Sequence, residues 1–261
     1  MPELPDVEAF REVLDRCARG RRIARVTVRD AGVLHGVSAA GLRSAVTGRR
    51  FAAPERRGKW LLAPTDGPTV VFHFGMTGRL VCAADGEPGH PHDRVVFALD
   101  GHRLRYRDQR KLKGLWLARD AAAVDRLLGD QGPDALTVDQ AAFDALLTGR
   151  RARVKSVLTD QSALAGLGNL LADEILWRAR LAPGTPAGAL DGRQRRRLHG
   201  EMRRVLREAV REGRVPPHGD WLTGHRRGAG ERCPRCGTAL ERGRVAGRGT
   251  VWCPSCQPVD G

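Results

Sequence analysis

The spacing of hydrophobic positions changes along the chain and divides it into helical and extended regions. A helix is predicted over residues 5–19, where apolar positions recur at helical spacing: Val7, Phe10, Val13, Leu14 and Cys17. From about residue 22 to 118 the pattern becomes short runs of valine, leucine and phenylalanine, separated by glycine and Asp-Gly turns. This region predicts an antiparallel sandwich or barrel with strands at 23–28, 59–63, 69–74, 94–99 and 104–107.

Helical spacing returns in the second half of the chain. One helix is predicted to end near Gly129, and others at 139–147, 154–158, 169–178 and 193–211. Residues 213–230 are rich in glycine, proline and arginine, which predicts a flexible connection. We therefore expect a multidomain α+β protein. Its parts are an N-terminal antiparallel β-sandwich domain with flanking helices (1–131), a helical domain (132–212), a short connecting loop (213–230) and a C-terminal metal-binding segment (231–261).

Four cysteines near the C-terminus predict a metal site. They form two C-x2-C pairs separated by sixteen residues: Cys233, Cys236, Cys253 and Cys256. This spacing is typical of a four-thiolate zinc site, in which one structural ion has no open position for chemistry. The segment between the pairs reads as a hairpin with turns at Gly237, Gly243, Gly247 and Gly249. A disulfide pair is the alternative interpretation. Cys17 and Cys82, far from this group, are expected to be ordinary reduced cysteines.

Charge indicates what the protein binds. The 261-residue chain has 45 lysines and arginines against 30 acidic residues, a net charge of +15, which favours a polyanionic partner and nucleic acid first. A membrane surface is the alternative, although no apolar run approaches the roughly 18 residues of a spanning helix. No signal peptide is visible, so we expect a cytoplasmic protein. Aromatic residues are only 5% of the chain, which argues against wide base-stacking platforms for single strands.

A glycine-containing turn in the helical half is a candidate phosphate site. One helix is predicted to end near Asp160 and the next to begin near Asn169, with Gly166 and Gly168 between them. Glycine allows a ligand to approach the backbone closely, and a helix N-terminus offers free N–H groups to an anion. An ordinary corner between two helices explains the same residues equally well.

The N-terminus carries a candidate nucleophile. A small residue at position 2 favours removal of Met1, which would make Pro2 the mature N-terminus with a secondary amine. A free α-amino group has a pKa near 7.7–8.0, so a useful fraction is neutral at physiological pH and can attack a carbonyl carbon. Glu3 stands beside it and could move protons. The simpler interpretation is that both residues merely precede a helix.

Taken together, five segments resemble the formamidopyrimidine-DNA glycosylase and endonuclease VIII family of base-excision repair enzymes. They occur in the family's order and cover essentially the whole chain. They are Pro2–Glu8 at the N-terminus, Arg57-Gly58-Lys59, His73–Arg79, Asp160–Glu174, and the cysteines with Arg248. The resemblance implies a helix–two-turn–helix motif in the helical domain and a zinc-finger hairpin at the C-terminus.

The resemblance also implies a reaction on DNA. The damaged nucleotide is extruded from the duplex, Pro2 attacks C1′, the base leaves, and a Schiff base forms. Elimination then nicks the strand on both sides of the lesion. On this basis Pro2 is the nucleophile, Glu3 the general acid/base, and Lys59 a phosphate ligand that stabilises developing charge. A solvated lysine at the start of a strand is the alternative for Lys59.

Further residues are assigned to DNA binding by the same resemblance. Asn169 and its neighbouring amides would hold backbone phosphates, Arg248 the phosphates beside the flipped nucleotide, and Arg110 the widowed base. Met76 would fill the gap left by the flipped base. Lys155 and His92 complete the set. The alternatives are core packing for Met76 and a charged helix face for Lys155, while Glu174 is expected to brace the helical motif. The expected partner is double-stranded DNA with damaged bases or abasic sites, bound by a monomer.

The sequence departs from the family pattern at several positions that bear on specificity. Asp6 stands where glutamate is usual, and Leu112-Lys113 where the 8-oxoguanine enzymes usually carry phenylalanine and glycine. The 213–230 connection is also shorter than the loop that caps a flipped purine in those enzymes. An oxidised pyrimidine, an abasic site or an adduct is therefore an alternative substrate. Two other classes stay open: a non-catalytic binder of damaged DNA, and a zinc-ribbon protein associated with ribosomes.

Overall fold

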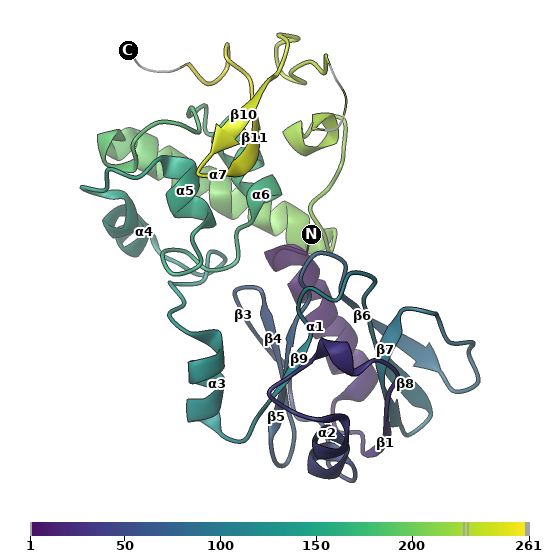
Figure 1. Cartoon of the computed structure of the whole chain (residues 1–261). Helices are drawn as coiled ribbons and strands as arrows, with labels where there is room; N and C mark the ends of the chain where they lie inside the picture. Colours follow the sequence, from purple (N-terminus) through teal and green to yellow (C-terminus); the bar gives the residue numbers. More distant parts are fainter. Residues whose placement is uncertain (1, 227, 229, 259–261) are drawn as a thin grey trace. The chain divides into compact units, whose positions relative to one another are not determined.

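The computed structural model describes residues 2–226, 228 and 230–258 (Figure 1). Its helices are α1 (Leu4–Ala18), α2 (Ala39–Val46), α3 (Ala121–Leu128), α4 (Gln140–Leu147), α5 (Val154–Thr159), α6 (Asn169–Arg178) and α7 (Gly192–Arg211), with 3-10 turns η1 (Ala31–Val33), η2 (Ala187–Ala189) and η3 (Leu222–His225). Its strands are β1 (Ile23–Val28), β2 (Leu34–His35), β3 (Glu55–Arg57), β4 (Trp60–Pro64), β5 (Thr69–His73), β6 (Arg79–Ala84), β7 (Asp93–Leu99), β8 (His102–Arg107), β9 (Leu115–Ala118), β10 (Glu241–Val245) and β11 (Arg248–Trp252).

The chain forms two compact units that divide at Gly129. The first unit contains Pro2 and Asp6–Gly129, and the second contains Glu3–Pro5 and the chain from Asp130 onward. Glu3 and the first two residues of α1, Leu4 and Pro5, therefore belong to the second unit, and α1 from Asp6 onward belongs to the first. No helix within the described residues is both long and apolar enough to cross a membrane.

The first unit is a β-sandwich. One sheet has the strand order β1-β7-β8-β6 and the other β2-β9-β5-β4-β3. Aromatic side chains from both sheets meet in the core: the Phe72 ring lies 6.4 Å from Phe97 and 6.0 Å from Tyr106. Leu14 of α1 belongs to the same buried cluster, and α3 packs outside the second sheet through Val124 and Leu128. The predicted α+β class and sandwich are confirmed.

The alternation of hydrophobic positions located β1, β4, β5, β7 and β8 and missed β2, β3, β6 and β9. β2 has two residues and pairs in parallel with β9, so the second sheet is not wholly antiparallel as predicted. β3 reads Glu-Arg-Arg, which carries no apolar signal, and the helix α2 was also missed. Ser38 caps α2 by accepting a hydrogen bond from the Gly41 amide. Serine at this position is a helix-start signal, but the apolar pattern that follows was too short for the helix to be predicted.

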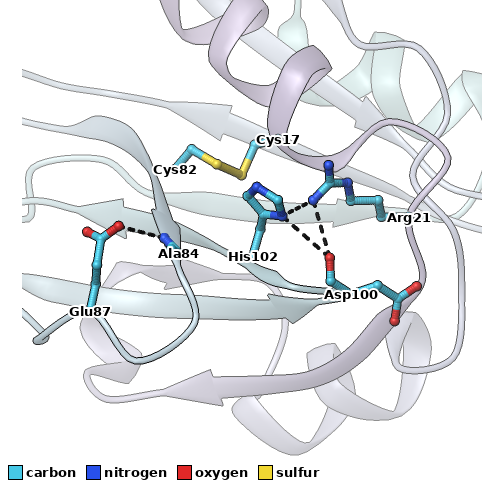
Figure 2. Close-up of a disulfide and its surroundings, with 7 residues drawn as sticks. All are labelled: Cys17, Arg21, Cys82, Ala84, Glu87, Asp100 and His102. Atoms are coloured by element: carbon cyan, nitrogen blue, oxygen red, sulfur yellow. Dashed lines mark hydrogen bonds between the residues drawn. A yellow bond between two sulfur atoms is a disulfide. The ribbon is translucent and has the colours of Figure 1, made fainter.

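The expectation that Cys17 and Cys82 are reduced is wrong. They form a disulfide that joins α1 to β6 across 65 residues of sequence (Figure 2). Cys17 is buried and Cys82 is exposed, so the bond lies where the helix meets the edge strand of the first sheet. Arg21 contacts the His102 ring close to this bond (Figure 2). Spacing could not predict the pair, because a separation of this size says nothing about where two cysteines meet in a fold.

The second unit contains a helical core and the cysteine hairpin. Helices α4, α5, α6 and α7 bury a continuous cluster that also includes Leu4, from the start of α1. Asp139 and Asp191 cap α4 and α7 by accepting hydrogen bonds from backbone amides in the first turn. α6 occupies the predicted residues, and α5 and α7 extend one residue beyond their predicted ranges at one end.

The segment after α7 is ordered over its described residues, contrary to the flexible connection predicted. Trp221 and Leu222 are buried, and the Thr223 amide donates to the Glu174 carboxylate at 3.2 Å. The Arg178 guanidinium lies 4.3 Å above the Trp221 ring and also donates to Glu174 at 2.9 Å. Glu174 therefore braces this segment against α6, as expected. Residues 227 and 229 of this stretch lie outside the described part of the chain.

Candidate active site and nucleic-acid interface

Glu3 is fixed at the N-terminus of α6. Its carboxylate accepts hydrogen bonds from the amides of Gly168 at 2.8 Å, Leu170 at 2.8 Å and Leu171 at 3.2 Å. These amides have no partner within the helix, and the positive end of the helix dipole favours an anion there. Glu3 is completely buried. The second candidate catalytic residue is therefore rigidly held one bond from Pro2, which is half-buried.

This arrangement corrects the prediction that a phosphate occupies the amides before and within the first turn of α6. A Cβ atom at Gly168 would lie 2.3 Å from Cδ of Glu3, and one at Gly166 would lie 2.5 Å from Leu4 Cδ1. Gly166 also has a φ of +109°, which disfavours other residues. Both glycines are thus required so that Glu3 and Leu4 can pack against the turn. The amides assigned to phosphate beside Asn169 are used by Glu3.

Lys155 is buried beneath the cysteine hairpin. Its Nζ lies 2.6 Å from Asp173 Oδ1 and donates to Thr250 Oγ1 at 2.7 Å and to the Gly249 carbonyl at 3.2 Å. Burial, together with the positive charges of Arg226 and Arg248, lowers the pKa of Lys155 to about 7, although the charge of Glu3 opposes this. Lys155 is neither an exposed phosphate ligand nor part of a solvated helix face in this structure. It connects α5 to the hairpin.

Hydrogen bonds at Gly249, Thr250 and Val251 hold β11 of the hairpin to the rest of the helical unit. The Gly249 carbonyl accepts from Lys155, from Asn169 Nδ2 at 2.8 Å and from Arg226 at 3.3 Å. The Val251 amide donates to Asp173 at 3.1 Å, and Arg226 forms an ion pair with the same carboxylate. Arg248, at the start of β11, is exposed next to this anchored peptide. The Asn169 side chain therefore contacts Gly249, the residue that follows Arg248.

The hairpin turn lies at Ala246-Gly247, where both residues have positive φ, between paired strands β10 and β11. Gly237 also has a positive φ, at +74°, in the first cysteine knuckle. The other two predicted turn positions are wrong, because Gly243 and Gly249 lie within the strands. Gly243 faces the Trp252 ring, which a Cβ atom would approach to 3.1 Å.

The four cysteines form the site of one structural zinc. Their sulfur atoms all lie within 4.8 Å of one another, with the Cys233–Cys256 pair at 3.9 Å and the Cys236–Cys253 pair at 3.5 Å. A tetrahedron of Zn–S bonds of about 2.3 Å has edges of about 3.8 Å, so the donor set fits the ion. Trp177 Nε1 lies 3.3 Å from Cys233 Sγ and donates to it, which joins α6 to the knuckle.

Lys59 lies in the two-residue turn between β3 and β4 of the first unit. Gly58, with φ +57°, begins this turn, and Arg57 pairs with Trp60 across it. Arg56 donates to Glu8 of α1 at 2.8 Å and to the Gly58 carbonyl at 3.0 Å. The turn is therefore held against the helix that follows Pro2. Lys59 is half-buried in the turn and not at the start of a strand.

Two exposed apolar side chains lie on neighbouring loops of the first unit. Met76 is 40% exposed and Leu112 is 50% exposed, and among the described residues they are the large hydrophobic side chains left at the surface. Gly75 packs against Leu112, since a Cβ atom there would lie 3.4 Å from that side chain. Met76 is thus not a core residue. Both side chains have the exposure expected of wedges that enter a base stack.

Asp108 organises these loops. It is buried, and its carboxylate accepts from Thr77 Oγ1 at 2.5 Å and from the Arg110 amide at 3.1 Å. Its own amide donates to the His92 carbonyl at 3.0 Å. Arg110 is exposed and His92 half-exposed beside it. Met76, Arg110 and His92, which the sequence assigned to DNA binding, are therefore brought to one part of the first unit.

His73 connects the Lys59 turn to the Met76 loop. It pairs with Trp60 across β4 and β5, and its Nδ1 accepts from the Gly75 amide at 3.1 Å. Burial, together with the positive charges of Lys113 and Lys59, lowers the pKa of His73 to about 4. This histidine is thus neutral at physiological pH and keeps Nδ1 as an acceptor for the loop.

Sequence reasoning missed three positioning residues: Asp108, Asp173 and Arg226. Asp108 lies two residues before Arg110, and Asp173 lies within the Asp160–Glu174 segment that resembles the family. No spacing rule distinguishes a buried carboxylate that holds a loop from an exposed one. Arg226 follows η3 in the segment expected to be flexible, where one arginine among many gave no signal.

A β-sandwich unit and a helical unit with a four-thiolate hairpin define the helix–two-turn–helix DNA glycosylases of base-excision repair. Family models match the chain in three consecutive parts. The formamidopyrimidine-DNA glycosylase N-terminal domain matches residues 1–115, its H2TH domain residues 131–216, and the zinc finger found in FPG and IleRS residues 230–259. The chain belongs to the formamidopyrimidine-DNA glycosylase family.

Individual relatives agree with this assignment. The chain is 39% identical to the formamidopyrimidine-DNA glycosylase of Salinispora arenicola, over 99% of this chain and 96% of that one. It is 40% identical to that of Moorella thermoacetica, over 94% and 95% of the two chains. Among solved structures, Lactococcus lactis Fpg bound to DNA containing an abasic site has a TM-score of 0.87 and 27% identity, with 99% of this chain and 100% of that chain covered.

Proposed function

We propose that this protein is a bifunctional DNA glycosylase and abasic-site lyase that uses the amine of Pro2 as its nucleophile. The class of activity follows from the family to which the chain belongs. The observation that supports the residue assignment most is the clamp on Glu3. A carboxylate held by three amides next to a proline amine is a fixed acid/base beside a nucleophile, the combination that an amine needs to form and resolve an iminium.

The proposed reaction begins once Met1 has been removed. The neutral Pro2 amine forms a bond to C1′ of the flipped nucleotide, and the C1′–N bond to the damaged base breaks with its electron pair leaving on the base, which takes up a proton. The Glu3 carboxylate takes the proton that the Pro2 nitrogen loses on forming this bond and passes it to the ring oxygen. The C1′–O bond then breaks as the nitrogen lone pair forms the iminium, and the sugar ring opens. Loss of a C2′ proton then expels the 3′-phosphate, and water releases the enzyme from the cleaved strand.

The two units supply different contacts to the DNA in this proposal. From the first unit, Met76 and Leu112 fill the space of the flipped nucleotide, Arg110 meets the opposite base, and Lys59 and His92 contact the backbone. From the second unit, Arg248 and the Asn169 side chain hold phosphates. Lys155 acts indirectly by fixing the Gly249 peptide beside Arg248. Zinc, when bound, supplies no chemistry and holds the hairpin that presents Arg248.

The substrate class is proposed from the relatives. The Salinispora and Moorella proteins are formamidopyrimidine-DNA glycosylases, so ring-opened purines are the first lesion to test. Lactococcus lactis Fpg has been solved with DNA containing Fapy-dG and with DNA containing an oxidised pyrimidine. Leu112 stands where the 8-oxoguanine enzymes usually carry phenylalanine. Pyrimidine lesions, abasic sites and adducts are therefore alternative substrates to be tested beside ring-opened purines. We further propose that the protein acts as a monomer on the bacterial chromosome in the cytoplasm.

The test is a cleavage assay on matched duplexes. The Met1-processed protein is incubated with end-labelled duplexes that differ only in one nucleotide: Fapy-dG, 8-oxoguanine, an oxidised pyrimidine, an abasic site or undamaged guanine. We expect strand cleavage at the lesion and at the abasic site, and none at guanine. Selective binding to damaged duplexes without cleavage of any of them would instead indicate a non-catalytic damage binder. Equal binding to all of them, with no cleavage, would favour a general zinc-ribbon protein.

A further inference from the structure

Seven exposed arginines lie along one side of α7, a helix that the proposed reaction does not use. Successive helical residues are rotated by about 100°, so these side chains fall within an arc of about 120°. The eighth residue in that arc is Gly200. We name this surface the α7 arginine face, and it consists of Arg193, Arg196, Arg197, Arg203, Arg204, Arg207 and Arg211, all exposed.

The α7 arginine face lies on the solvent-exposed side of α7. The opposite side of α7 is buried in the core shared with α4 and α6, through Leu198, Met202, Val205, Leu206 and Ala209. Arg197 lines a pocket with Ser255 and Cys256 of the second cysteine pair, and Arg204 lines another with Arg235 of the first pair. The other five arginines line neither pocket, and the face lies opposite the buried side of α7. It is a surface separate from the phosphate-binding residues Asn169 and Arg248 within the same unit.

The arginines are not explained by interactions within the protein. Among the described residues, Arg204 is the member of the face with acidic partners, Glu201 at 3.9 Å and Glu208 at 3.2 Å. Pairs of like charge four residues apart, such as Arg203 and Arg207, destabilise a helix by about 0.2–0.5 kcal/mol each. The sequence thus maintains a repulsive surface, which is expected when an external anion neutralises it.

Gly200 is a second, independent observation at the middle of this face. Glycine inside a helix is about 0.8–1.0 kcal/mol less favourable than alanine. No packing requires it, because a Cβ atom at Gly200 would meet nothing within 4 Å. Because Gly200 has no side chain, another molecule's backbone can approach the helix closely between Arg196 and Arg203.

We propose that the α7 arginine face binds the backbone of a second DNA duplex while the active site holds the damaged one. From Arg193 to Arg211 the face extends about 27 Å, the length of about eight base pairs. It contains no apolar side chain that could anchor a protein partner, whereas a row of cations alone fits a phosphate backbone. This inference rests on the proposed function only in that DNA is the substrate, and it goes beyond that function.

A capture experiment tests this proposal. A duplex with a non-cleavable abasic-site analogue is fixed to beads, loaded with zinc-bound full-length protein and washed free of unbound protein. A fluorescent undamaged duplex is then added over a range of salt concentrations. The wild type is expected to retain it. The variant R196Q/R203Q/R207Q should lose affinity for the second duplex and show a logarithmic salt dependence shallower by about 3.

The matched control carries the same change of charge elsewhere. Arg16, Arg25 and Arg43 are exposed in the first unit, and R16Q/R25Q/R43Q should capture the second duplex as the wild type does. Both variants should nick a short damaged duplex at the wild-type rate, so failure of this proposal is distinguishable from failure of the proposed function. No capture by the wild type, or equal capture by the two variants, would overturn it.

Discussion

At the scale of single residues, the structure gives Glu3 two roles that depend on the same carboxylate. It caps α6 and stands beside the candidate nucleophile. The carboxylate is buried and accepts hydrogen bonds from three amides. The N-terminal tripeptide Glu3–Pro5 consequently belongs to the helical unit, although the rest of α1 belongs to the sandwich.

Glu3→Gln separates these two roles. The glutamine carbonyl oxygen can still accept from the α6 amides that one carboxylate oxygen serves, but the NH2 group cannot accept from the others. We therefore expect the protein to fold with a loss of stability. Glutamine cannot exchange a proton as a carboxyl group does, and base excision should fall by about 100-fold or more. Single-turnover cleavage of a damaged duplex measures this. Glu12→Gln, at an exposed position of α1, is the control and should cleave normally.

Gly168→Ala should displace Glu3, because the added Cβ would lie 2.3 Å from the Glu3 carboxyl carbon. We expect both a lower unfolding temperature and a large loss of cleavage. Gly200→Ala is the matched change in open space, and it should stabilise the protein by up to about 1 kcal/mol while cleavage is unchanged. The unfolding temperature and the cleavage rate of each variant are measured. If Gly168→Ala and Gly200→Ala changed both quantities in the same way, the proposed clamp on Glu3 would be contradicted.

At the scale of secondary-structure elements, two cross-links join elements to one another: a disulfide in the first unit and the zinc cysteines in the second. The Cys17–Cys82 disulfide joins α1 to β6, and the zinc cysteines join the ends of the β10–β11 hairpin. Each cross-link adjoins elements that carry candidate site residues: α1 follows Pro2, and β11 begins with Arg248. Their loss should therefore affect stability and function in different units.

Cys82→Ser removes the disulfide and should lower the free energy of unfolding of the first unit by about 2–4 kcal/mol, because a loop closed over 65 residues restricts the unfolded chain. Denaturant unfolding followed through the first unit measures this. A thiol reductant should lower the stability of the wild type by a similar amount and leave the variant unchanged. A wild type that does not respond to reductant would show that the bond does not form in solution.

Removal of zinc should release the hairpin from α6 while the sandwich stays folded. Without the ion nothing holds the four cysteine sulfur atoms together, and the Gly249 and Val251 contacts depend on the hairpin's shape. Chelation, or Cys253→Ser, should therefore weaken binding to damaged duplexes at least tenfold and reduce cleavage with it. Added zinc should restore the chelated wild type but not the variant. Full activity of Cys253→Ser would contradict this role.

At the scale of the whole molecule, the sequence predicts whatever depends on local spacing. Most helices, the strands β1, β4, β5, β7 and β8, and the cysteine site follow from periodicity and from C-x2-C spacing, and α6 was placed at its observed residues. The disulfide, the Asp108 loop network and the Lys155–Asp173–Arg226 group were not predicted, because each joins residues distant in sequence. The phosphate site assigned to Gly166 and Gly168 failed for the same reason, since the anion at α6 is the protein's own Glu3.

Borohydride trapping is the most direct test of whether the Pro2 amine is the nucleophile. The Met1-processed protein is incubated with an abasic-site duplex in the presence of borohydride, and the covalent product is digested and sequenced by mass spectrometry. If Pro2 is the nucleophile, we expect a reduced adduct on the Pro2 nitrogen that is absent in protein retaining Met1. An adduct on a lysine such as Lys59, or no adduct despite strand cleavage, would contradict Pro2 as the nucleophile.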